Sequence, residues 1–315
     1  RRCFRARGVA VALASGACFA PDAAAMPTEV TNFLTRIASD AAANSLTLRS
    51  ADWTDGEVAH AGADYVIGLS GTIRTPNATP TIFKGNSLQL GTDSVRANLA
   101  QKNGELTFEN DGLYLRNVSW THWSATVTVR INGRVTVTSP RTKPALFTNS
   151  DGNDRTGCEF TGDWHAAPEC GIRVSLGAPR LAYRLTLSGD LRDYRGGILV
   201  DTGAILALGT TELPGEIQLK GGICPGRLEP RQAGDRTGIG TLELESGSRL
   251  AFKVRRDPDG RLVHNSLFVT DRFAVGSAIE IEVNPAVDKL AGTEARRFPF
   301  LTLGADAAGE HDADT

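Results

Sequence analysis

Large aromatic and sulfur-containing side chains are scarce in this chain of 315 residues. Phe, Tyr and Trp make up 6% of it, and it has a single Met. A bundle of helices packed on bulky side chains is therefore disfavoured. Hydrophobic residues still reach 41%, enough for a core, and Gly occurs 34 times. This composition favours many short strands and turns over general disorder.

An excess of one charge is also missing. The formal net charge is −2, and opposite charges are interspersed, as in Arg255-Arg256-Asp257. Proteins that bind nucleic acid normally present a basic face. The sequence therefore argues against a nucleic-acid partner.

Long apolar runs are absent as well. The run that stands out, Gly8–Ala20, is shorter than the roughly 20 residues of a transmembrane helix. Arginines at positions 1, 2, 5 and 7 precede it, and the small residues Ala23–Ala25 follow it. This pattern predicts an export signal over residues 1–25 that is removed from the mature chain.

Cysteine is sparse beyond that signal, where only Cys158, Cys170 and Cys224 remain. Cys158 and Cys170 flank a polar segment, and an exported protein meets oxidising conditions. We therefore predict a disulfide between them. Cys224 would then be the odd thiol, and we expect it to be buried as a small hydrophobic residue.

One stretch alone has convincing helical periodicity. Val30, Phe33, Leu34 and Ile37 recur at helix spacing, and Thr28 is a suitable N-cap. The sequence therefore predicts a short helical cap over residues 26–44.

Residues 45–304 have the pattern of short strands. Apolar or alternating runs such as Tyr65–Ile67, Leu113–Leu115 and Ile279–Ile281 are bounded by Gly, Asn, Asp or Pro. Alternation with a period of two places one side of each strand in a core. The chain is predicted to be all-β, with a polar, acidic tail over residues 305–315.

Internal repetition decides between all-β architectures. Gly85, Leu88 and Leu90 have the spacing G-x-x-L-x-L, which recurs from Gly203 and, with Phe at the last position, from Gly247. A corner glycine followed by a short strand is what a β-solenoid needs. We therefore predict a solenoid of about a dozen coils of roughly 20–25 residues.

A β-sandwich is the alternative architecture. It would need hairpin turns between matched strands. Ile131-Asn132-Gly133-Arg134 is the best candidate for such a turn.

Residues 185–209, LTLSGDLRDYRGGILVDTGAILALG, resemble the autotransporter-associated β-strand repeat, also called the passenger-associated transport repeat. One extra residue separates Gly189 from Tyr194, and another separates Gly203 from Gly209. The positions that carry the resemblance are Leu185, Thr186, Leu187, Gly189, Tyr194, Gly196, Gly197, Val200, Gly203, Leu206, Leu208 and Gly209.

The resemblance implies a right-handed parallel β-helix, exported and displayed at, or released from, the outer membrane. A translocator β-barrel, in cis or in trans, would be its partner. No barrel sequence occurs within the chain, so we expect either a fragment or a different export route. The repeat carries no catalytic residues, since its positions are corners and core.

One polar loop is a weak candidate for binding a metal ion. Asp151, Asn153 and Asp154 lie in a polar loop whose oxygens are of the type that Ca²⁺ prefers. Arg155, however, occupies a position where a calcium loop of the EF-hand type needs an oxygen. The alternative is a solvated loop, and we predict no metal and no cofactor.

A polysaccharide lyase or glycoside hydrolase is the main alternative to a non-catalytic protein. Such chemistry needs paired acids, or a basic residue beside bound Ca²⁺. Asp151, Asp154 and Asp163, with Arg155 or Arg173, form the one cluster that fits.

Trp120 and Trp123 are the candidate ligand-binding residues. Exposed Trp rings stack on sugars or anchor protein partners, whereas buried ones fill a coil corner. Both interpretations stay open on the sequence. We expect a secreted or surface-displayed rod or adhesin-like surface, non-catalytic, whose partner is a host or extracellular glycan or protein.

Overall fold

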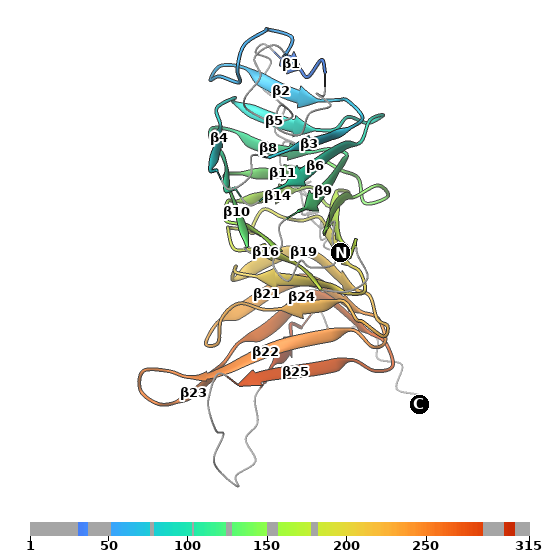
Figure 1. Cartoon of the computed structure of the whole chain (residues 1–315). Coiled ribbons are helices and arrows are strands. Elements are labelled where there is room, and N and C mark those ends of the chain that lie inside the picture. The colour runs from blue at the N-terminus through green and yellow to red at the C-terminus, as the bar shows by residue number, and fades with distance from the viewer. Residues whose placement is uncertain are drawn as a thin grey trace, which may run out of the picture.

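The strands of this chain are stacked in one continuous column (Figure 1). The computed structural model describes residues 31–36, 52–75, 79–102, 104–123, 128–149, 157–177, 182–285 and 299–305. Within these residues every named element is a strand, and no α-helix occurs.

The strands form three sheets, which are the walls of the column. Sheet I has six strands: β1 (Thr31–Phe33), β2 (Asp64–Ile67), β5 (Ser87–Leu90), β8 (Gly112–Leu115), β11 (Val135–Val137) and β14 (Trp164–Ala166). Sheet II has ten strands: β3 (Thr72–Arg74), β6 (Ala97–Gln101), β9 (Val118–His122), β12 (Ala145–Asn149), β15 (Gly171–Val174), β17 (Gly197–Val200), β19 (Glu212–Leu219), β21 (Arg236–Leu244), β24 (Ser266–Val275) and β26 (Leu301–Leu303).

Sheet III also has ten strands: β4 (Thr81–Phe83), β7 (Leu106–Phe108), β10 (Val129–Asn132), β13 (Gly157–Phe160), β16 (Tyr183–Leu187), β18 (Ala204–Leu208), β20 (Arg227–Glu229), β22 (Arg249–Arg256), β23 (Leu262–His264) and β25 (Glu280–Pro285).

Successive strands visit the walls in turn, as a β-solenoid requires. Every pairing between named strands is parallel except that of β22 with β23, which projects as a hairpin (Figure 1). The predicted parallel β-helix is therefore confirmed, and the β-sandwich is excluded. The ten strands of sheet II correspond to ten coils, close to the expected dozen.

The cross-section of the column changes along its length. From β2 to β16 each coil contributes one strand to each wall, whereas from β17 onward only sheets II and III continue. Tyr194, fully buried, takes the place of a sheet I strand at the change through a single parallel bridge to Ala166. The later coils have longer strands: β19, β21 and β24 have 8, 9 and 10 residues.

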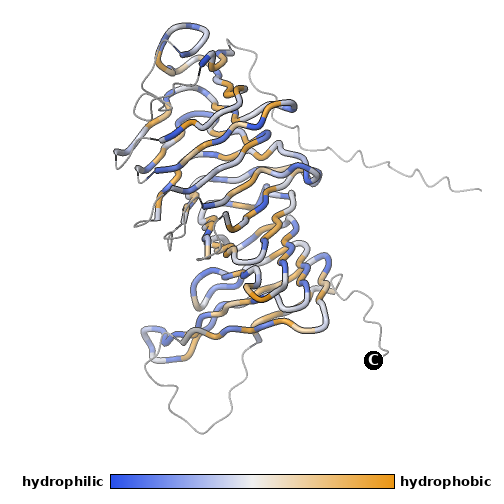
Figure 2. Tube along the Cα trace, turned by 45° about the vertical axis from the view of Figure 1, so that its right-hand side comes forward, coloured by the Kyte–Doolittle hydropathy of each residue, from blue (hydrophilic) through white to orange (hydrophobic). Residues whose placement is uncertain are grey.

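Alternating side chains build the core, and polar and apolar segments alternate along the coils in Figure 2. Leu88 lies in register with Leu113, and both are fully buried. Backbone hydrogen bonds between neighbouring coils join residues from 20 positions apart, as in Glu216 with Gly196, to 35 apart, as in Gly304 with Val269. The variable coil length explains why the sequence motifs recur without a fixed period.

The segment that resembles the autotransporter repeat forms one complete coil. Its two ends stack on each other, because Leu185 pairs with Leu206 and Leu187 with Leu208. All four leucines are core residues, exposed by 3% or less. The repeat thus begins and ends on sheet III, and its two leucine pairs form neighbouring inward columns between the same two coils.

Glycines at the corners allow neighbouring coils to approach. A Cβ added to Gly189 would lie 1.9 Å from the backbone oxygen of Gly162 in the coil before it. Gly203 has a φ of 77°, the left-handed conformation expected of a corner glycine. Gly85 does not have a positive φ. Its lack of a side chain instead leaves room for the rings of Phe83 and Tyr65, each of which would lie 2.6 Å from a Cβ at this position.

The predicted N-terminal helix is wrong where it can be compared with the structure. Thr31–Phe33 form strand β1, which pairs in parallel with β2, and the rest of the predicted span lies outside the described residues except 34–36. Asn32 is buried because Asp55 and Thr54 satisfy its side chain, whereas Phe33 is 49% exposed. Stacking on β2 outweighs the helical spacing of the apolar residues.

The two ends of the column differ in how their interiors are covered. Near β2, Trp53 is buried edge-on against Tyr65, with ring centroids 4.8 Å apart. At β25, Ile281 and Val283 continue the inward columns of Leu250 and Phe252, yet they are 55% and 40% exposed.

Candidate functional site

The outer face of sheet III carries a continuous ladder of ion pairs. The coil register places arginines from β16, β20 and β22 near glutamates from β20 and β25, so that positive and negative groups alternate across the coils. In order, the ladder is Arg184, Glu229, Arg227, Glu282, Arg249 and Glu280.

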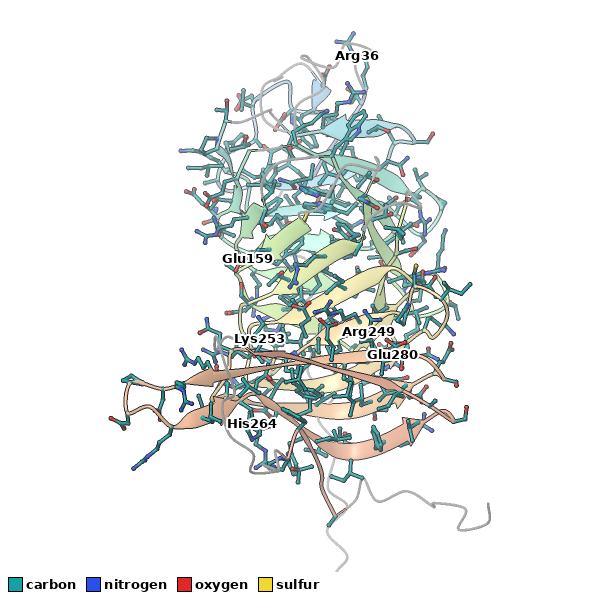
Figure 3. The ribbon with its side chains drawn as sticks, turned by 60° about the horizontal axis from the view of Figure 1, so that its bottom comes forward. Arg36, Glu159, Arg249, Lys253, His264 and Glu280 are labelled. Atoms are coloured by element: carbon teal, nitrogen blue, oxygen red, sulfur yellow. The ribbon has the colours of Figure 1, made fainter. Side chains whose placement is uncertain are left out.

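Glu229 is the centre of this ladder. Its carboxylate lies 2.7 Å from Nη1 of Arg184 and 3.1 Å from Nε of Arg227, and its side chain is only 5% exposed. At the other end, Nε of Arg249 donates to Glu280 over 2.8 Å, and Figure 3 shows these two labelled side chains close together. The ladder neutralises charge on this wall and ties coils together.

A second ion pair crosses several coils on sheet II. Arg141 reaches Glu216, 75 positions away in the sequence, by lying over Gly171 and Gly197. A Cβ on Gly197 would lie 3.1 Å from the guanidinium carbon of Arg141. Because neither glycine has a side chain, the side chain of Arg141 can lie across both of them and reach Glu216. This ion pair joins the coils at the point where the cross-section changes.

Trp120 is a core residue and not a ligand-binding one. It is fully buried in β9, stacked on Phe147 at 6.0 Å and edge-on to Phe160 at 5.4 Å between ring centroids. Its ring cannot reach a surface ligand, so that part of the prediction is wrong. Burying such a side chain stabilises the fold by roughly 1.5–3 kcal/mol.

Trp123 lies on the opposite side of the wall and is partly exposed. Nζ of Lys102 lies 3.7 Å from the centroid of its ring, and the guanidinium carbon of Arg74 lies 4.9 Å from it. Each cation–π contact contributes about 0.5–1 kcal/mol at a site of this exposure. We call Arg74, Lys102 and Trp123 the cationic cluster.

The coil register brings the cluster together. Gln101 and His122 are paired, so Lys102 and Trp123 follow at the same corner of neighbouring coils. Arg74 comes from the coil before, in register with Ala100. Ala100 faces outward but is only 2% exposed, and its small side chain leaves the space through which Arg74 reaches the Trp123 ring.

Sequence analysis missed Arg74 and Lys102. Both are isolated basic residues in the chain, and no motif includes them. Their proximity depends on coil lengths, which the sequence does not fix. The backbone amide of Lys102 donates a 2.7 Å hydrogen bond to Thr75, which follows Arg74 and lies 27 positions earlier in the sequence. This separation is one coil length, and a coil length of 27 would have predicted that the two basic residues meet.

Beneath the cluster the interior is polar. Gln101, His122 and Asn149 occupy the same inward column in three successive coils and are exposed by 1% or less. Gln101 donates to the carbonyl of Gly104 at 3.0 Å, and Asn149 accepts from the amide of Gly177 at 2.9 Å. These two hydrogen bonds hold the corner at which the chain leaves sheet II.

The predicted disulfide is wrong. Cys158 and Cys170 are both free and buried, and β14 of sheet I lies between them along the chain. Cys158 faces the core from sheet III between Val129 and Leu185, whereas Cys170 sits at the corner before β15. Burial raises the pKa of the Cys170 thiol. Cys224 is exposed and not buried as expected.

The weak calcium candidates Asp151, Asn153 and Asp154 lie outside the described residues, as does Arg155. The remaining members of the predicted catalytic cluster are not brought together. Asp163 is exposed between β13 and β14, and Arg173 is on sheet II, where its Nε donates to Asp201 over 2.6 Å.

Two titratable groups on the wall near sheet I have shifted pKa values. Hydrogen bonds from the side chain and from the backbone amide of Arg192 lower the pKa of Asp190 to about 2. Burial, aided by the charge of Arg134, lowers the pKa of His165. Nδ1 of His165 lies 3.5 Å from the carboxylate of Asp193, and Asp190 is held by its own arginine.

A hollow with a volume of about 520 Å³ lies beside the later coils of sheet II. Its charged lining is Arg173, Asp201, Lys220 and Glu245, which form two ion pairs with each other. Charges that neutralise one another in this way leave little potential for a charged ligand.

The comparisons with known proteins give no similarity from which a function could be inferred. No known family, curated protein or solved structure matches this chain. In the described part of the chain, no group of three His, Cys, Asp or Glu residues is placed to hold a metal ion. The described residues also contain no helix that is both long and apolar enough to cross a bilayer.

Proposed function

We propose that this chain is the β-helical passenger part of an autotransporter-like bacterial surface protein. It acts as a non-catalytic rod and as an adhesin-like display surface. The observation that supports this is the uninterrupted column of parallel coils, with ten strands in each of two walls. Each coil needs its neighbour to bury its inward side chains, so such a column folds progressively as it emerges from a membrane.

The outer walls fit the role of a display surface. Ion pairs between coils, such as Arg184 with Glu229 and Lys220 with Glu245, keep the column rigid without occupying its ends. Long flat walls present many weak contacts at once, and such contacts add by avidity. The resemblance of residues 185–209 to the passenger repeat, together with the expected signal over residues 1–25, supports export to the outer membrane.

Labelling of intact cells tests this proposal. An antiserum against the chain should stain unpermeabilised cells, and added protease should remove the signal while a periplasmic marker survives. Staining that requires lysis of the cells would overturn the surface assignment.

A parallel assay tests whether the chain is catalytic. The purified chain is incubated with uronate polymers and neutral glucans, and new reducing ends and unsaturated sugars are measured. Release of either above the buffer control would favour the polysaccharide lyase or hydrolase over the rod.

A further inference from the structure

The hairpin of β22 and β23 carries the single Asp–Pro bond of the chain, between Asp257 and Pro258. Arg256 pairs with Leu262 at the end of the two strands, so the bond lies at a tip that projects from the column (Figure 1). Residues 258–260 are all exposed. We infer that the chain cleaves its own backbone between Asp257 and Pro258 in mild acid. This activity goes beyond the proposed function and does not rest on it.

Hydrogen bonds within the hairpin hold the tip in a defined turn. The amide of Asp257 donates to the carbonyl of Arg261 over 2.9 Å, and the amide of Arg261 donates back to Oδ1 of Asp257 over 2.8 Å. The amide of Gly260, whose φ is 77°, donates to the carbonyl of Asp257 over 3.0 Å. Nη1 of Arg256 donates to the carbonyl of Gly260 over 2.8 Å. The turn is therefore ordered before the reaction begins, which lowers the entropic cost of reaching the reactive geometry.

These hydrogen bonds give the two carbonyl groups of Asp257 complementary roles. Its backbone carbonyl oxygen gains negative charge when the carbonyl carbon is attacked, and that oxygen already accepts from the amide of Gly260. Its side chain is oriented through Oδ1, whereas Oδ2 accepts no hydrogen bond from the described residues. Oδ2 is thus available as the nucleophile for the backbone carbonyl carbon of its own residue.

Pro258 is a suitable leaving group. Its nitrogen has no N–H and no backbone hydrogen bond to lose. When Oδ2 of Asp257 attacks, a cyclic anhydride forms, the C–N bond to Pro258 breaks, and the electron pair of that bond goes to the proline nitrogen, which takes a proton from the acidic solvent. Water then opens the anhydride and leaves Asp257 with its side-chain carboxyl and a new α-carboxyl. The overall reaction consumes one water and needs no other reactant.

The charged neighbours of Asp257 on the hairpin are Arg256, Asp259 and Arg261. Among the described residues none of them forms an ion pair with Asp257, and its contact with Arg261 is through the backbone amide. The reaction requires an ionised carboxyl and an available proton at the same time. We therefore expect cleavage to be fastest in mild acid.

The column holds both fragments together after cleavage. The fragment 258–315 keeps β24, which pairs with β21, and β25, which pairs with β22. Leu267 and Val269 of β24 are fully buried in the core. Cleavage therefore nicks the hairpin without releasing the last coils.

Incubation of the purified full chain at roughly pH 4–5, where aspartates are partly ionised, tests the inference. No protease is added, and the lowest pH in this range that preserves the native circular dichroism spectrum is used. Denaturing electrophoresis should show two fragments, and mass spectrometry should show that the smaller one begins at Pro258. The same sample should elute from gel filtration as one species. In urea at the same pH, the bond should break about tenfold more slowly, because the unfolded chain lacks the donor to the developing oxyanion.

Substitutions at the tip separate this chemistry from contaminating proteolysis. Asp257→Asn keeps an oxygen for the amide of Arg261 but removes the nucleophilic carboxylate, so it should stop cleavage. Pro258→Ala makes the leaving nitrogen that of an ordinary secondary amide and should slow cleavage by about tenfold or more. The matched control is Asp259→Asn, which removes a carboxylate from the same tip and should change the rate by less than about twofold.

Four results overturn the inference: no fragment that begins at Pro258, an equal rate in urea, cleavage that persists in Asp257→Asn, or an equal loss in Asp259→Asn. Separation of the fragments in gel filtration would overturn the claim that the coils retain them. None of these results changes the surface staining of cells. Failure of this inference is therefore distinguishable from failure of the proposed function.

Discussion

Glu229 offers the sharpest test of how the coils are held together. Its side chain is 5% exposed and contacts two arginines, Arg184 and Arg227, which are themselves 35% and 21% exposed. Breaking a fully buried ion pair destabilises a protein by 3–5 kcal/mol, and an exposed pair contributes roughly 0–1 kcal/mol. Glu229→Gln leaves Arg184 without its anion and leaves Arg227 with Glu282 alone, so we expect a loss of about 2 kcal/mol.

Glu280→Gln is the matched control at the end of the same ladder. Glu280 contacts Arg249 but is 54% exposed, so its loss should change stability by less than about 0.5 kcal/mol. Urea unfolding of both variants, followed by circular dichroism at low and high salt, measures the difference. Hydrogen exchange at β18, β20 and β22 checks that the loss is local. Equal destabilisation by the two variants would refute the argument that burial decides the strength of the ladder.

Three further outcomes follow from the coil packing. Gly189→Ala should destabilise the chain by about 1–3 kcal/mol, since its Cβ would meet a backbone oxygen, whereas Gly238→Ala, with 3.7 Å of room, should be nearly neutral in the same unfolding assay. His165 has a lowered pKa in the folded chain, so stability should be constant above the unfolded pKa of about 6.5 and fall as pH drops below it. Melting curves at several pH values should have a smaller slope in His165→Gln, and an unchanged slope would contradict the assignment. Iodoacetamide with peptide mapping should label Cys224 in the native chain but Cys170 only after unfolding, and reductant should leave the melting temperature unchanged.

The alternation of side chains could have separated the two tryptophans without a structure. Val118, Trp120 and His122 share one parity, and Ser119 and Thr121 share the other. The structure places the first set inside the core and Trp123 outside it. Because successive side chains in a strand point to opposite faces, the odd separation of three residues sets the two rings on opposite sides of one wall. The prediction treated them as a pair and was wrong for Trp120.

The N-terminal helix and the disulfide failed for a different reason. Helical spacing of apolar residues around Phe33 is a local signal, and the edge of β2 outweighed it by offering backbone hydrogen bonds. Cys158 and Cys170 are close in the sequence, yet the chain crosses sheet I between them, so Cys158 lies on sheet III and Cys170 at the corner before sheet II. In a solenoid, sequence proximity within a coil places residues around the perimeter and not beside each other.

The sequence by itself determined that this chain is a stack of short strands with glycine corners. Period-two alternation and corner residues act locally, so they can be recognised in a single sequence. Only the tertiary structure decided which coil lies on which, because coil lengths vary and each register is set by packing against the neighbouring layer. The meeting of Arg74 and Lys102 on Trp123 is a consequence of that register, and so is the ladder centred on Glu229.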